Sequence, residues 1–122
     1  MTKRSYAEDR IQASIVHYLR TCAPQCLSFA CPNGGLRSKA EAAKMKWTGT
    51  LAGIPDLIVL APHGVVLGLE VKAPGNYASP EQKAIAEHWR ALGHTWALVR
   101  SIDDVKLVLA ATGVKTREAV AA

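Results

Sequence analysis

Residues 54–72 read IPDLIVLAPHGVVLGLEVK, two apolar runs separated by a short segment that contains proline and glycine. Because these two residue types interrupt strands and favour turns, the runs are predicted to fold back on one another as a β-hairpin. If residues 62–64 form the loop, counting outward along both strands places Asp56 opposite Glu70. The hairpin is therefore expected to hold two carboxylates side by side in an apolar setting.

Two opposed acids need a compensating cation. Directly opposed residues of an antiparallel pair have Cβ atoms roughly 5 Å apart, and like charges there destabilise the sheet. A hard divalent metal ion with oxygen ligands is the natural compensation. Lys72 lies two residues beyond Glu70, so it projects from the same face of the strand. Two acids and an amine on one face, at a strand end, indicate a metal-dependent hydrolytic site.

Length and composition are those of an ordinary globular protein. With 122 residues, 49% of them hydrophobic and 20% charged, a single domain covering residues 1–122 is expected. No apolar stretch approaches the ~20 residues that span a bilayer. No apolar signal core follows the basic pair near the N-terminus. We therefore expect no membrane association and a cytoplasmic location.

The net charge bears on the kind of binding partner, and the cysteine spacing bears on metal binding. The net charge of +5 suits a polyanionic partner. The three cysteines, Cys22, Cys26 and Cys31, match no zinc-binding spacing and are predicted to be reduced thiols that pack in the fold.

Hydrophobic periodicity and turn residues predict eight elements in the order α-β-α-β-β-α-β-α. The expected helices cover residues 5–21, 36–49, 80–92 and a last segment after Ser101, and the expected strands cover 26–30, 54–60, 65–72 and 95–100. Leu92 is expected to be buried, and the tail after Gly113 is expected to fray. This order predicts an α/β fold, a mixed β-sheet with helices on both sides.

Glu8 lies on the apolar stripe of the first expected helix, which contains Ile11, Ile15 and Leu19. A carboxylate on such a stripe is unusual and points to a buried, functional acid. Alternatively, Glu8 is an ordinary first-turn residue, where the helix dipole favours a negative charge. The sequence leaves both interpretations open.

The second expected helix has an excess of positive charge. It carries Arg37, Lys39, Lys44 and Lys46 against the acid Glu41. Mixed charge usually marks a solvated helix face, but the position just before the acidic hairpin equally favours contacts with phosphates.

Together these residues resemble the VRR-NUC family of the PD-(D/E)XK nuclease superfamily. The core motif corresponds to Pro55-Asp56 and Glu70-Val71-Lys72. The surrounding pattern comprises Glu8, Asn33-Gly34 with Arg37, Gly53-Ile54-Pro55-Asp56-Leu57, Gly75, Ser79-Pro80-Glu81-Gln82 and Gly93. The resemblance extends from about residue 6 to about residue 105 and departs from the family at no catalytic position.

The resemblance implies a restriction-endonuclease-like fold and a Mg²⁺- or Mn²⁺-dependent phosphodiesterase acting on DNA. Asp56, Glu70 and the Val71 carbonyl would hold the metal, with Glu8 as a further acid, directly or through water. Lys72 would orient or deprotonate the attacking water, and Gln82 would be a supporting residue. Contacts to DNA are expected from Asn33, Arg37, Lys39, Lys44 and Lys46. Small stand-alone members look like phage or bacterial proteins, which implies the cytosol of a bacterium or of a phage-infected host.

The substrate and the oligomeric state are less constrained. A homodimer with two-fold symmetry would match a symmetric, Holliday-junction-like four-way junction, as in the resolvases that this family resembles, whereas a monomer would suit a flap or a nick. We expect endonuclease action on branched DNA. One alternative is a non-catalytic nucleic-acid-binding module of the same fold. Another is a structural protein in which Asp56 and Glu70 pair with Lys72 and an arginine.

Overall fold

The computed structural model describes residues 5–32 and 38–118. The helices are α1 (Tyr6–Cys22), α2 (Lys39–Trp47), α3 (Pro80–Ala91) and α4 (Ile102–Ala111), and the strands are β1 (Leu27–Ala30), β2 (Leu57–Ala61), β3 (Val65–Val71) and β4 (Thr95–Val99). A single 3₁₀ turn, η1 (Pro62–Gly64), joins β2 to β3. The elements follow the predicted order.

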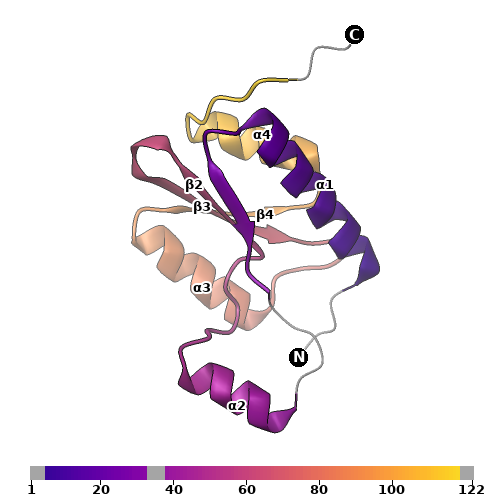
Figure 1. Ribbon diagram of the computed structural model, residues 1–122, viewed down its shortest axis with the longest axis vertical. Coiled ribbons are helices and arrows are strands. Elements are labelled where there is room, and N and C mark those ends of the chain that lie inside the picture. Colours follow the sequence, from indigo (N-terminus) through magenta and orange to yellow (C-terminus); the bar gives the residue numbers. More distant parts are fainter. Residues whose placement is uncertain (1–4, 33–37, 119–122) are drawn as a thin grey trace.

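The four strands form one mixed sheet in the order β1-β2-β3-β4 (Figure 1). The pairs β1–β2 and β2–β3 are antiparallel, and β3–β4 is parallel. The hairpin register runs from Ala61 opposite Val65 to Leu57 opposite Leu69, which agrees with the counting from the sequence. Since parallel neighbours need a crossover connection, α3 carries the chain from β3 back to the start of β4.

Helices cover both faces of the sheet, as predicted. One face packs against α1 and α4 and forms the core, whose most buried members are Ile15, Leu19, Leu57, Val59, Leu67, Leu69, Val71, Val99, Val105 and Leu109. Side chains alternate between faces along a strand, so Gly68 in β3 faces the other side. There a Cβ at Gly68 would lie 3.0 Å from the Trp89 ring of α3 and 2.7 Å from Pro55. Glycine at this position lets α3 approach the sheet.

Two expectations about packing were wrong. Leu92 is 63% exposed, because α3 ends at Ala91 and faces the sheet through Ala86, with Trp89 half-buried. The tail after Gly113 does not fray along its described part. Val114 is buried, and the Tyr18 hydroxyl of α1 donates to Glu118 at 2.8 Å. Long-range contacts of this kind leave no local sequence pattern.

Helix α2 differs from the other helices because none of its residues is buried. It is shorter than the expected 36–49, and it lies apart from the sheet at one end of the molecule (Figure 1). Its first turn is capped by the Ser38 side chain, which accepts from the Glu41 N–H at 3.1 Å. The helix is therefore stabilised by its capping hydrogen bonds, because it buries no apolar side chains.

Two smaller predictions can be compared with the structure. All three cysteines are free thiols, as expected. Within the two described ranges, no helix has the length and apolarity needed to cross a bilayer.

Candidate active site

Asp56 and Glu70 meet where β2 begins and β3 ends. Extending the register by one residue beyond the Leu57–Leu69 pair puts these carboxylates opposite each other. Both are withdrawn from solvent, with 5% of Asp56 and 1% of Glu70 exposed. The Val71 backbone N–H donates to Asp56 Oδ2 at 2.8 Å, which fixes that side chain against β3. Buried charges of this kind need hydrogen-bond or ionic partners to remain stable.

Glu70 has two such partners on its Oε2 atom. Lys72 Nζ lies 3.9 Å from it, and Gln82 Nε2 donates to it at 3.1 Å. The alternation along β3 therefore puts Glu70 and Lys72 on one face, as the spacing predicts. The Lys72 side chain keeps 15% of its surface exposed, so the ammonium group can still meet an incoming group from solvent.

Gln82 connects the site to the start of α3. Its Oε1 accepts from the Ser79 N–H at 2.9 Å, and its own N–H donates to Ser79 Oγ at 3.2 Å, which forms a capping box. The remaining amide nitrogen is the one that donates to Glu70. The two roles considered for Gln82, helix capping and support of the acid, thus coexist in one side chain.

Gly53 fixes how the chain enters the site. Its φ of +83° is a left-handed conformation that favours glycine. A Cβ there would lie 2.7 Å from the backbone of Glu81 and 3.0 Å from the Gln82 nitrogen. The segment before Asp56 therefore packs directly on the first turn of α3, beside the glutamine that holds Glu70.

Glu8 is buried, with 6% of its surface exposed, which decides against a simple first-turn acid. Its Oε2 accepts from the Ala73 N–H at 2.9 Å and from Asn76 Nδ2 at 2.8 Å. These donors belong to the turn that follows Lys72. Through these two hydrogen bonds Glu8 holds the turn that follows β3. Among the described residues, no group of three or more His, Cys, Asp and Glu side chains could hold a metal ion.

Arg100 also holds the turn that follows β3, although the sequence did not single it out as a site residue. Its Nη1 donates to the carbonyls of Ala73 at 2.7 Å and Asn76 at 2.8 Å, and its guanidinium lies 5.3 Å from the Tyr77 ring centroid. The available signal was topological: Arg100 follows β4, whose end pairs in parallel with the end of β3. Glu8 and Arg100 together clamp the turn next to Lys72.

The predicted DNA-contacting residues lie apart from the acids. Lys39, Lys44 and Lys46 are exposed on α2, which lies apart from the sheet at one end of the molecule (Figure 1). Asn33 and Arg37 fall outside the described residues.

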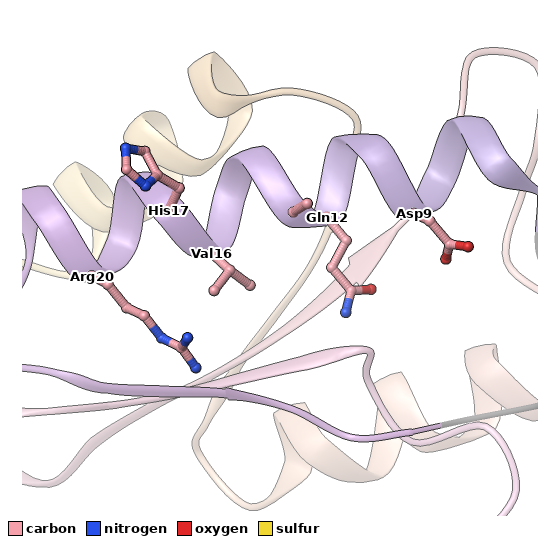
Figure 2. A pocket seen from close by; sticks show the side chains of 6 residues that line it. Asp9, Gln12, Val16, His17 and Arg20 are labelled. Carbon is pink, nitrogen blue, oxygen red and sulfur yellow. The ribbon is translucent and has the colours of Figure 1, made fainter.

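A hollow beside α1 is separate from the acidic site. It has a volume of about 530 Å³ and is lined by Asp9, Gln12, Ala13, Val16, His17 and Arg20. Figure 2 shows Gln12 and Arg20 pointing from α1 toward the neighbouring strand, where Arg20 donates to the Ser28 carbonyl of β1 at 3.4 Å. None of the predicted catalytic residues lines this hollow.

The donor set of the site suits a hard divalent cation. Asp56, Glu70 and the Val71 carbonyl offer only oxygen atoms, which Mg²⁺ and Mn²⁺ prefer. The Cys31 N–H donates to the Asp56 carbonyl at 2.9 Å, so a thiol lies close by. Burial, together with the charge of Asp56, raises the pKa of the Cys31 thiol. The donors that fit such an ion are the carboxylates of Asp56 and Glu70 and the Val71 carbonyl.

Comparison of the fold places the chain among known structures. It matches a "VRR_NUC domain protein" with a TM-score of 0.69 and 23% identity, over 93% of each chain. A second structure, "VRR_NUC domain", matches with a TM-score of 0.60 and 24% identity, over 87% of this chain and 97% of the other. The chain therefore has the fold of VRR_NUC domain proteins.

Sequence comparison gives a more local likeness. The chain is 39% identical over 61 residues to "Putative nuclease p44" of Acyrthosiphon pisum secondary endosymbiont phage 1. The match spans 48% of this chain and 62% of that relative, a little under two thirds of its length. No family model matches the chain.

Proposed function

We propose that this protein is a nuclease that hydrolyses DNA phosphodiester bonds with a divalent metal ion, Mg²⁺ or Mn²⁺. The observation that carries the proposal is the buried Asp56–Glu70 pair with the Lys72 ammonium 3.9 Å from Glu70. A pure binding module gains nothing from acids that repel phosphates. The VRR_NUC fold and the likeness to a phage protein named as a nuclease support the same class.

The residues of the site would have two roles, which are to hold the metal ion and to act on the attacking water. Asp56, Glu70 and the Val71 carbonyl would hold the ion, which supplies polarisation of a phosphoryl oxygen and a lower pKa for a bound water. Lys72 would orient or deprotonate the attacking water and offset negative charge that develops on the phosphate. Gln82 keeps Glu70 oriented through its 3.1 Å hydrogen bond. Glu8 fixes the turn that follows Lys72.

Branched DNA is the proposed substrate, and a homodimer is the proposed assembly. The described part of the chain forms one such acidic site, whereas a symmetric junction requires cuts in two strands. A two-fold dimer would present two equivalent sites to such a junction. The net charge of +5 supports a nucleic-acid partner in general.

The test is a cleavage assay on four-way junction, flap, nicked and linear DNA, with Mg²⁺, Mn²⁺ or EDTA. We expect cleavage with either metal, no cleavage in EDTA, and a preference for branched substrates. Asp56→Ala is the matched control and should bind DNA without cutting it. Mn²⁺ should also raise the melting temperature of the wild type but not that of Asp56→Ala. DNA binding without cleavage in every metal would instead identify a non-catalytic binding module.

A further inference from the structure

Trp47 stands out among the three tryptophans because 85% of its surface is exposed. Trp96 is buried, and Trp89 packs against the position of Gly68. A single exposed apolar side chain is common and needs no explanation by itself. Three further features distinguish Trp47 from an incidental surface residue. They are the capped helix end that carries it, the neighbouring lysines and the position of α2 in the fold.

Hydrogen bonds cap the C-terminal end of α2, which carries the indole. Trp47 is the last residue of α2, and the Thr48 hydroxyl donates back to the Met45 carbonyl at 3.1 Å. Gly49 adopts a φ of +112°, and the Thr50 N–H donates to the Met45 carbonyl at 2.8 Å. These bonds satisfy the end of the helix in the manner of a C-terminal capping motif. The indole is therefore presented on a regular helix end.

The surroundings of the indole are basic. Lys44 lies one helical turn before Trp47, and Lys46 directly precedes it. Residues three apart on a helix are surface neighbours, so Lys44 and the indole share one side of α2. An aromatic ring beside ammonium groups can stack on a base while the amines bind the adjoining phosphates. This charge favours a nucleic acid over a second, equally basic copy of the chain.

The place of α2 in the fold brings this surface within reach of the acidic site. The helix lies in the connection from β1 to β2, and a segment of nine residues joins its last residue, Trp47, to the start of β2 at Leu57 (Figure 1). Trp47 precedes Asp56 by nine residues, and an extended chain spans at most about 3.6 Å per residue, so the two Cα atoms lie within about 32 Å of each other. Duplex DNA advances about 3.4 Å per nucleotide of one strand, so this span equals at most about ten nucleotides of duplex and fewer of an extended single strand.

We propose that Trp47 stacks on an unpaired base of the bound DNA, while Lys44 and Lys46 hold the adjacent phosphates. In a duplex each base is covered by its neighbours, so only an unpaired base offers its flat face to an indole. Helix α2 would thus recognise single-stranded or branch-point nucleotides near the cut. This inference rests on the proposed nuclease function and adds the feature of the DNA that the protein recognises.

The experiment measures binding of the full chain to a short oligo(dT) strand and to a blunt duplex, with Ca²⁺ in place of Mg²⁺. Trp47→Ala should weaken oligo(dT) binding by about 5- to 150-fold, the range for losing one base–aromatic stack. Trp47→Phe should keep most of the affinity. Duplex binding should change by less than about 2-fold, because phosphate contacts dominate it. The matched control is Leu51→Ala, which removes a nearby exposed apolar side chain that cannot stack.

Tryptophan emission gives an independent readout. Oligo(dT) should quench wild-type emission and leave Trp47→Phe nearly unchanged, because Trp89 and Trp96 are packed in the fold. Equal losses on duplex and oligo(dT), or unaltered quenching in Trp47→Phe, would overturn the inference. So would a dimer in sedimentation that Trp47→Ala dissociates, or an emission shift with anionic lipid vesicles alone.

The outcomes separate this inference from the function on which it rests. If the wild type binds and cleaves DNA and the Trp47 variants behave identically to it, the stacking role fails and the nuclease stands. If the wild type neither binds nor cleaves any DNA, both fail.

Discussion

At the scale of single residues, each carboxylate of the site has an assigned hydrogen-bond donor. Asp56 accepts from the Val71 N–H and Glu70 from Gln82. Counting the hairpin alone would suggest that removing either acid only relieves repulsion. The structure adds an opposing effect, since Asp56→Ala leaves a buried N–H without its acceptor, at a cost of about 1–3 kcal/mol.

Lys72→Ala is expected to abolish cleavage while leaving DNA binding largely intact. General acid–base groups contribute roughly 10²–10⁴-fold to rates, so a loss in that range should appear in single-turnover assays. The exposed Lys83 on α3 provides a matched control, and Lys83→Ala should cleave normally. Cleavage by Lys72→Ala within a few-fold of the wild type would remove Lys72 from the mechanism.

Glu8 and Arg100 should act together, because both hold the turn that contains Ala73 and Asn76. Glu8→Gln and Arg100→Ala are each expected to lower activity by about 10–100-fold, as supporting residues of metal sites do. The double variant should lose little more activity than either single variant, because each single change already frees the turn. Raising Mn²⁺ should partly rescue both singles. A higher metal requirement in Glu8→Gln alone would instead mark Glu8 as a ligand of the metal shell.

At the scale of elements, α2 is stabilised by capping hydrogen bonds at its ends and exposes several charged side chains. Reversing Lys44 and Lys46 to Glu should weaken binding about equally for all DNA sequences. Each lost phosphate contact should reduce the slope of log Kd against log salt by about 0.9. The melting temperature should hardly change, because α2 buries no residue. An unchanged salt slope would show that these lysines only solvate the helix.

At the scale of the whole molecule, the tail closes the fold through Glu118, which meets the Tyr18 hydroxyl at 2.8 Å and Lys106 at 3.6 Å. The Tyr18 bond, followed by the charge of Lys106, lowers the pKa of Glu118 below its ordinary value near 4.5. A lowered folded-state pKa stabilises the fold above the unfolded value, and that stability is lost as the pH falls through the folded value.

Glu118→Gln should therefore melt below the wild type at pH 7, and the difference should close at a pH below the folded-state pKa of Glu118. Thermal melts of both proteins at pH 7 and at that lower pH measure the difference in melting temperature directly. Thr116→Ala tests the neighbouring weak contact at 3.4 Å and should have a smaller effect. A difference between Glu118→Gln and the wild type that persists in acid would assign the effect to packing.

The sequence alone determined the order of the elements and the hairpin register, because both depend on local patterns. Apolar periodicity, turn residues and the spacing from Asp56 to Glu70 are enough to place two acids and Lys72 on one face. The residues named for the acidic site were likewise readable as a motif, although their catalytic roles remain predictions.

The tertiary structure alone decided which partner each of these groups meets. The clamp of Glu8 and Arg100 on one turn joins residues 8, 73, 76 and 100. The docking of Gly53 on α3, the exposure of Leu92 and the attachment of the tail to α1 also depend on elements distant in the chain. Such contacts follow from how helices pack against the sheet, and no pattern within a short segment encodes them.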